Sequence, residues 1–248
     1  MEPIVKQLLK RIIGLTPFRV TRARDLNRFQ AIDETLALIA RRGFAPRVVI
    51  DGGANVGDFA RLARRVFGAE PEIHLFEPQP ACQPSLESLA RDPRVHLHAV
   101  ALGAAEGGKL ALAIDPLGVT TGAHIAPSGS GVATVSVGVA TLDALFESRL
   151  ERSDRVLLKL DLQGWELEAL KGATKSLPRV EVVLIEVSLY AQAYEPPISA
   201  IVGFLDNAGF ELHDIASLSG RFRDNRARQA DLLFVNRRSD LCSDTSWA

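Results

Sequence analysis

The side chains best suited to chemistry in this 248-residue sequence are carboxylates that stand at the ends of apolar segments. Asp51 ends the run Val48-Val49-Ile50 and Glu186 ends a similar run, whereas Glu77 and Asp161 end two strand-like segments that are mostly apolar. Carboxylates attract cations, accept hydrogen bonds and take protons from hydroxyl groups. These residues therefore indicate a site for a polar or cationic ligand that also contains candidates for a general base.

A glycine-rich turn, Gly52 to Gly57, directly follows Asp51. Glycine permits backbone angles and close approaches that a Cβ forbids, and a helix that starts there offers unpaired N–H groups. In dinucleotide sites of the form G-x-G-x-x-G the middle glycine admits a pyrophosphate, but here that place is Ala54. An acid before the turn also repels a diphosphate and attracts an ammonium group. The turn therefore favours a cofactor such as S-adenosylmethionine, which carries an ammonium group and no phosphate.

Glu77, which is followed by Pro78, supports the same cofactor. A carboxylate at this strand end can accept hydrogen bonds from both hydroxyls of a ribose, and it excludes a 2′-phosphate. Together with Asp51 it favours a methyltransferase over a nicotinamide-dependent dehydrogenase. The alternative is that both acids only cap helices or solvate strand ends.

The elements that must position these residues alternate between strand and helix. Strands are predicted at 47–51, 72–77, 95–100, 109–114, 133–139, 155–161, 180–187, 210–215 and 231–236. Helices are predicted at 22–42, 57–67, 81–91, 165–175 and 199–207, with Thr141 capping another. This order predicts a Rossmann-like α/β fold, in which helices cover both faces of a mostly parallel sheet. The last two strands lack a helix between them and are expected to form an antiparallel pair at the sheet edge.

The sequence divides into a predicted N-terminal helical extension (residues 1–45), an α/β domain (residues 46–237) and a flexible polar tail (residues 238–248). Apolar residues of the segment 4–13 recur at helical spacing opposite lysines and an arginine. We expect this face to pack on the domain or on a second subunit, as in a homodimer. An anionic membrane surface is the alternative.

The composition is typical of a soluble globular protein, with 47% hydrophobic residues, 24% charged residues and a net charge of -1. It gives no indication of a nucleic-acid surface. Cys82 and Cys242 are far apart and form no disulfide framework, and no apolar run approaches the roughly 20 residues that span a bilayer. We therefore expect a cytoplasmic protein. No spacing of His, Cys or acidic residues typical of a metal site is found, so no metal is expected.

From Val48 to Asn236 the sequence resembles the FkbM-type methyltransferase family, whose members are S-adenosylmethionine-dependent and methylate oxygen. The block Lys159-Leu160-Asp161-Leu162-Gln163-Gly164-Trp165-Glu166, leading to Leu170-Lys171-Gly172-Ala173, is the most particular match. The other matching blocks are Val49 to Gly57, Phe76-Glu77-Pro78, Ala99 to Gly103 and Thr141-Leu142-Asp143.

This resemblance implies a class I methyltransferase fold with a seven-stranded, mostly parallel sheet and an antiparallel edge strand. It also implies a set of cofactor-binding residues. Asp51, Gly53, Asn55 and Gly57 would surround the methionine part of the cofactor, Glu77 and Pro78 would lie at the ribose, and Val100 and Ala101 would lie near the adenine. Asp161 would face the sulfonium and the methyl acceptor. Gln163 departs from the family, which usually has a glutamate there, and this leaves a catalytic role for the position in doubt.

The candidates for a general base are Asp161, Glu166, Glu186 and His124. Asp161 is the first choice, with a purely cofactor-orienting role as the alternative. Glu166 falls in the first turn of its helix, where the helix dipole favours a carboxylate in any case. His124 belongs to a glycine-rich segment that could close over the acceptor.

Lys159 lies on the same strand face as Asp161, and as a buried lysine it needs a carboxylate partner, either Asp51 or Glu186. We assign His124 and Lys159 to the substrate side of the site. The expected acceptor is a small molecule or glycan, namely a hydroxyl of a sugar precursor or of a secondary metabolite. A catalytically silent cofactor-binding scaffold, suggested by Gln163, and a nicotinamide oxidoreductase, opposed by Ala54, are the alternatives.

Overall fold

The computed structural model describes residues 27–114, 119–126, 131–190, 195–221, 223–243 and 246. The predicted helix at residues 4–13 lies outside them. The predicted helix at 22–42 is wrong in its described first part, because Asn27–Gln30 form strand β1 and helix α2 covers only Ile32–Arg41. The backbone of β1 pairs with a distant strand, with Asn27 opposite Ser219. This long-range pairing overrides the local helical pattern.

The predicted mostly parallel sheet is confirmed. Its strand order is β1-β10-β11-β9-β8-β2-β3-β4. The strands are β2 (Val48–Gly52), β3 (Glu72–Phe76), β4 (Val95–His98), β8 (Val156–Leu160), β9 (Val180–Ser188), β10 (Phe210–Gly220) and β11 (Ala227–Asn236). The five neighbouring strands β4, β3, β2, β8 and β9 are parallel to one another. Strands β10 and β11 form the predicted antiparallel pair. β11 lies between β9 and β10, and β1 adds an eighth strand at the edge.

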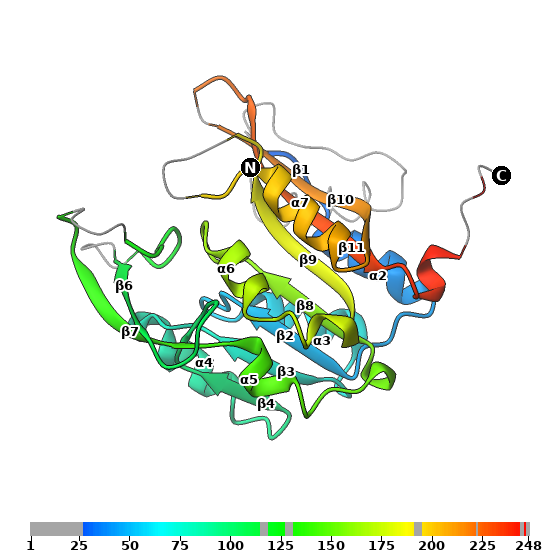
Figure 1. The fold of residues 1–248 in the computed structure, drawn as a ribbon, viewed down its shortest axis with the longest axis horizontal. Helices are drawn as coiled ribbons and strands as arrows, with labels where there is room; N and C mark the ends of the chain where they lie inside the picture. Colours follow the sequence, from blue (N-terminus) through cyan, green and yellow to red (C-terminus); the bar gives the residue numbers. More distant parts are fainter. Residues whose placement is uncertain are drawn as a thin grey trace, which may run out of the picture.

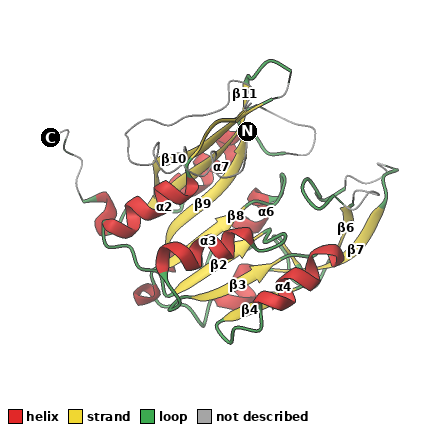
Figure 2. Cartoon of the chain, turned by 180° about the vertical axis from the view of Figure 1, so that it is seen from behind, coloured by secondary structure: helices red, strands yellow, loops and turns green. Residues whose placement is uncertain are grey.

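Helices cover both faces of this sheet. One face packs against α5 (Leu142–Phe146), α6 (Glu166–Lys171) and α7 (Ile198–Asn207), which Figure 1 shows in front. The other packs against α2, α3 (Asp58–Phe67) and α4 (Gln83–Leu89), seen in Figure 2. Each face of the sheet has its own hydrophobic core, because successive strand residues point to opposite faces. Val48 and Ile50 belong to the core on one face, and Val49 belongs to the core on the other. No described helix is long and apolar enough to cross a membrane.

Shorter elements complete the chain. A second sheet has the order β5-β7-β6, from β5 (Ala101–Leu102), β6 (Lys109–Ala113) and β7 (Thr134–Ala140). The 3-10 helices are η1 (Pro80–Cys82), η2 (Arg152–Asp154), η3 (Leu177–Arg179) and η4 (Asp240–Cys242). Thr141 caps α5 as predicted, because its side chain accepts a hydrogen bond from the N–H of Ala144. The second sheet stands beside the carboxyl ends of the parallel strands (Figure 1) and there forms one wall of a cavity.

Candidate functional site

The glycine-rich turn packs directly against the end of the neighbouring strand β8. Gly53 has a φ of +75°, and a Cβ added there would lie 1.9 Å from the carbonyl oxygen of Asp161. The N–H of Asp161 donates to the carbonyl of Gly52 at 3.1 Å. Gly53 is therefore required both by its backbone angle and by the closeness of β8. Gly57, with a φ of +89°, precedes α3 and packs on Leu89, away from the cavity walls.

A buried ion pair lies beneath this turn. The ammonium nitrogen of Lys159 is 3.0 Å from a carboxylate oxygen of Asp51 and also donates to the carbonyl oxygens of Gly53 at 2.8 Å and Gly52 at 3.2 Å. The predicted carboxylate partner of Lys159 is thus confirmed as Asp51. Burial raises the pKa of Asp51, although Lys159 opposes the shift. Burial alone would lower the pKa of Lys159, but Asp51 and Asp161 outweigh it and hold that pKa above its ordinary value.

Asp51 does not line the cavity where the ligand site was expected. The side chain is fully buried and its charge is engaged by Lys159. The expectation that Asp51 attracts the ammonium group of a cofactor directly is therefore corrected. Asp51 instead pairs with Lys159, whose ammonium group donates to the carbonyl oxygens of Gly52 and Gly53.

A cavity of about 210 Å³ opens at the carboxyl ends of the parallel strands. Glu77 lies in its wall and is only 3% exposed. Its two carboxylate oxygens accept hydrogen bonds from the N–H groups of Asn55 at 2.8 Å and Gln79 at 2.9 Å. Burial raises the pKa of Glu77, while those two N–H groups oppose the rise. Pro78, Val100 and Ala101 also line the cavity, so these predicted cofactor residues lie together.

Residues of the segment 119–126 also line the cavity, namely Thr120, Thr121, Gly122, Ala123 and Ile125. The hydroxyl of Thr120 donates to the side-chain oxygen of Asn55 at 2.9 Å, and its carbonyl accepts from the amide of Gln79 at 3.1 Å. Thr120 was not among the predicted site residues. His124 was, but it does not line the cavity, and its Nδ1 lies 3.0 Å from the carbonyl oxygen of Gly122.

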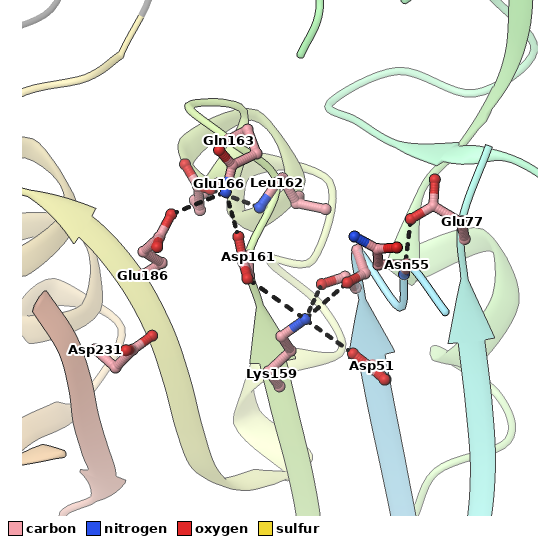
Figure 3. Close-up of polar contacts among 12 residues, drawn as sticks. Asp51, Asn55, Glu77, Lys159, Asp161, Leu162, Gln163, Glu166, Glu186 and Asp231 are labelled. Atoms are coloured by element: carbon pink, nitrogen blue, oxygen red, sulfur yellow. Dashed lines mark hydrogen bonds and ion pairs between the residues drawn. The ribbon is translucent and has the colours of Figure 1, made fainter. Parts of the chain in front are cut away.

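A network of carboxylates and amides occupies the other end of the cavity (Figure 3). The side-chain nitrogen of Gln163 donates to Asp161 at 2.8 Å and to Glu186 at 3.1 Å. The amide of Gln229 donates to the same oxygen of Glu186 at 3.1 Å. Burial, together with the neighbouring charges of Asp161 and Asp231, raises the pKa of Glu186 to about 9. Asp161 and Glu186, two of the candidates for a general base, thus lie on either side of Gln163.

Asp231 is a residue of this site that the sequence did not predict. It lies on β11 opposite Glu186 on β9, and its carboxylate accepts a hydrogen bond from the hydroxyl of Ser217. Together with Lys159 it lines a second cavity of about 450 Å³. The two cavities adjoin, and their walls share five residues, namely Gly53, Asn55, Thr120, Thr121 and Asp161. The side chain of Asp161 is 37% exposed, so its carboxylate is accessible to a ligand in this region.

Glu166 turns toward the backbone rather than into the main cavity. It is 4% exposed, and its carboxylate accepts hydrogen bonds from the N–H groups of Leu162 at 2.6 Å and Gly164 at 3.1 Å. Gln163 has a φ of +53° and Gly164 a φ of +99°. Glu166 thus holds a tight turn in the conformation that aims Gln163 at the two carboxylates. Burial raises the pKa of Glu166 to about 7.

This raised pKa predicts how stability depends on pH. A carboxyl that binds its proton more tightly in the folded than in the unfolded chain stabilises the fold below its unfolded pKa, and this contribution is lost as the pH rises through the folded pKa. Between about pH 5 and pH 8, the melting temperature of the wild type should therefore fall relative to that of Glu166→Gln. Thermal melts followed by circular dichroism check this, with Glu168→Gln on the same helix as the control. If the difference in melting temperature between the wild type and Glu166→Gln is the same at every pH, the prediction is wrong.

The family model described as Methyltransferase FkbM domain matches residues 51–212. The chain is similar to methyltransferase FkbM from Methylobacillus flagellatus KT, at 16% identity and a TM-score of 0.48, over 77% of this chain and 43% of that one. It thus spans less than half the length of that protein. No curated protein matches the sequence.

Two further solved structures are similar to the chain. One is magnesium protoporphyrin IX methyltransferase from Synechocystis PCC 6803 with bound SAM, at 15% identity and a TM-score of 0.46, over 83% of this chain and 77% of that one. The other is fibrillarin from Aeropyrum pernix in complex with S-adenosyl-L-methionine, at 14% identity and a TM-score of 0.45, over 82% of this chain and 74% of that one.

Proposed function

Because the chain belongs to the FkbM methyltransferase family, we propose that it transfers the methyl group of S-adenosylmethionine to a hydroxyl of a sugar or glycan precursor, or of a secondary metabolite. S-adenosylmethionine, when bound, supplies an electrophilic methyl group on a positively charged sulfur. The task of the protein is to align the acceptor oxygen with that methyl group and to exclude water.

The residues of the main cavity fit this cofactor. Glu77 is buried and held by two N–H groups, and each carboxylate oxygen keeps a further lone pair for a ribose hydroxyl. Phe76, Val100 and Leu112 provide apolar walls near Glu77 that suit a purine base. Gly53 packs closely against the backbone of Asp161, and the carboxylate of Asp161 lines the cavity and supplies negative charge for a cationic ligand.

The observation that carries the proposal is the position of Asp161 between the two cavities. A carboxylate there can attract the positive end of the cofactor and can also take the proton of an acceptor hydroxyl. The hydrogen bond from Gln163 fixes its orientation. Asp161 is thus our proposed general base, and Lys159 below it secures the turn.

The chemistry of the walls near Asp161 supports a hydroxylated acceptor. Glu186 and Gln229 line the main cavity, and Asp231 lines the second. Carboxylates accept hydrogen bonds from hydroxyls, and a glutamine amide both donates and accepts them. An acceptor with several hydroxyl groups satisfies such walls better than an apolar one, since buried polar groups need partners.

Two measurements test the proposal. Calorimetric titration should show binding of S-adenosylmethionine and S-adenosylhomocysteine, whereas binding of NAD alone would refute the cofactor assignment. Release of S-adenosylhomocysteine is then followed against a panel of hydroxylated sugars, nucleotide-linked sugars and secondary metabolites, with amine and thiol acceptors for comparison. Turnover confined to amines or thiols would refute O-methylation. Cofactor binding without turnover on any acceptor class would favour the silent scaffold.

Gln163→Glu restores the residue usual in the family and should change the pH dependence of turnover. A further carboxylate between Asp161 and Glu186 disfavours negative charge in the cluster, so the cluster releases its protons at higher pH. The acidic limb of the kcat/KM profile should therefore move up by about 1–3 pH units. The measurement is kcat/KM against pH with the best acceptor of the panel.

Gln163→Met is the matched variant, because it removes both hydrogen bonds without adding charge. It should lower kcat more than it changes the affinity for S-adenosylhomocysteine, since Asp161 loses its orienting partner while the ribose site at Glu77 is untouched. If both variants keep the wild-type profile and kcat, the amide of Gln163 has no part in positioning Asp161.

A further inference from the structure

Three of the five histidines of the chain gather on one face of the strands β3 and β4, at the sheet edge. His74 on β3 is the direct neighbour of His96 on β4, and His98 lies two residues further along β4. Residues two apart on a strand share a face, so Glu72 joins His74 on the same side of β3. The proposed methyl transfer uses none of these four side chains.

These side chains are close enough to share one cation. Glu72, His74 and His96 each offer a ligand atom, and the three atoms lie within 4.8 Å of one another. Zinc binds imidazole nitrogen and carboxylate oxygen at about 2.0–2.2 Å, so side-chain shifts of roughly an ångström or less place a cation between them. His74 is 2% exposed. Such burial favours the uncharged imidazole, which is the form that binds metal ions.

The surroundings provide the support that a metal-binding histidine usually has. Nδ1 of His74 lies 3.1 Å from Nε2 of His98, and the ring of Phe146 packs edge-on against His74 at a centroid distance of 4.9 Å. A ring held in this way by a second hydrogen-bonding partner is pre-oriented for a metal ion. Arg149 brings a positive charge near His74 and His98.

A second group of possible ligands, Glu211, His213 and Cys242, is less suited to the same role. Nε2 of His213 lies 3.1 Å from a guanidinium nitrogen of Arg42. Because arginine only donates, this contact engages the lone pair of that imidazole nitrogen.

We propose that Glu72, His74 and His96 form a binding site for a divalent transition-metal cation of the zinc type, with His98 orienting His74. Such an ion joins the edge strand β4 to β3 and does not depend on the methyl-transfer function. A set of one carboxylate and two imidazoles suits zinc, and it suits magnesium or calcium poorly, because those ions prefer oxygen ligands.

The test uses the full chain after dialysis against a chelator. Zn²⁺ is titrated by calorimetry and Co²⁺ by visible absorption, which reports the ligand geometry. We expect one ion per chain at this site, a higher melting temperature in Zn²⁺ and no comparable effect of Mg²⁺. Glu72→Gln and His96→Gln keep the buried His74 in place. Each substitution should weaken Zn²⁺ binding by at least about 10–100-fold, which is the effect of losing an outer-shell partner of a metal ligand.

His213→Gln is the matched control, because it removes a histidine from the competing group. Zn²⁺ binding that survives His213→Gln and is lost in Glu72→Gln and His96→Gln supports the proposal. If Zn²⁺ binding is absent in the wild type, or is lost only in His213→Gln, the proposal is overturned and the three histidines form a stacked cluster without a metal. Binding of S-adenosylhomocysteine, measured in the same samples, tests the proposed function separately.

Discussion

Asp161→Asn should lower kcat by about 10²–10⁴-fold, the range that a general base contributes. Asparagine keeps the size of the side chain and an oxygen that can accept the hydrogen bond from Gln163, but it cannot take the proton of an acceptor hydroxyl. The affinity for S-adenosylhomocysteine should fall much less, because the ribose site that we propose at Glu77 is unchanged. Turnover and calorimetric binding measured on the same preparation separate the two effects.

The control for this variant is Asp206→Asn. Asp206 lies on α7, its side chain is 64% exposed, and its partner Arg237 is on the surface. This change should leave both turnover and cofactor binding as in the wild type. If Asp161→Asn also retains wild-type turnover, Asp161 has no part in proton transfer and serves only to bind the cofactor.

Lys159→Met should be the most destabilising of the substitutions considered. It leaves the carboxylate of Asp51 fully buried without its cation, and breaking a buried pair in this way costs about 3–5 kcal/mol. This loss is a large part of the free energy of unfolding of an ordinary protein, which is about 5–15 kcal/mol. Urea unfolding measures the loss, and cofactor binding should weaken with it, since the turn at Gly53 loses its donor.

Two further variants separate the loss of the buried ion pair from other effects of the substitution. In the double variant Asp51→Asn/Lys159→Met the buried charge is gone, so much of the lost stability should return. Lys171→Met removes an exposed partner of Glu168, a pair of the kind worth about 0.2–1 kcal/mol. If Lys159→Met costs no more than Lys171→Met, the buried pair does not stabilise the turn.

The parts of the site that the sequence predicts are those encoded by a single strand and the residue that follows it. Glu77, Asp161 and Glu186 stand out in the sequence because each follows a mostly apolar, strand-like segment. The partner of Lys159 could be narrowed to two acids because a buried ammonium group requires one. In each case the local pattern and elementary electrostatics carry the inference.

The parts that could not be predicted depend on which strands become neighbours. Asp231 enters the site only because β11 pairs with β9 and places it opposite Glu186. β1 owes its strand conformation to β10, far along the chain. The i, i+2 spacing of His96 and His98 is visible in the sequence, but His74 joins them only through the pairing of β3 with β4.

The two hydrogen bonds of Thr120 connect one wall of the cavity to the residues that hold Glu77. They attach the segment 119–126 to Asn55 and Gln79, the same two residues whose N–H groups hold Glu77. The same two residues thus anchor both the carboxylate of Glu77 and this wall of the cavity. A ligand that displaces Glu77 should therefore also shift the wall, so we expect binding at Glu77 and the position of the wall to be linked.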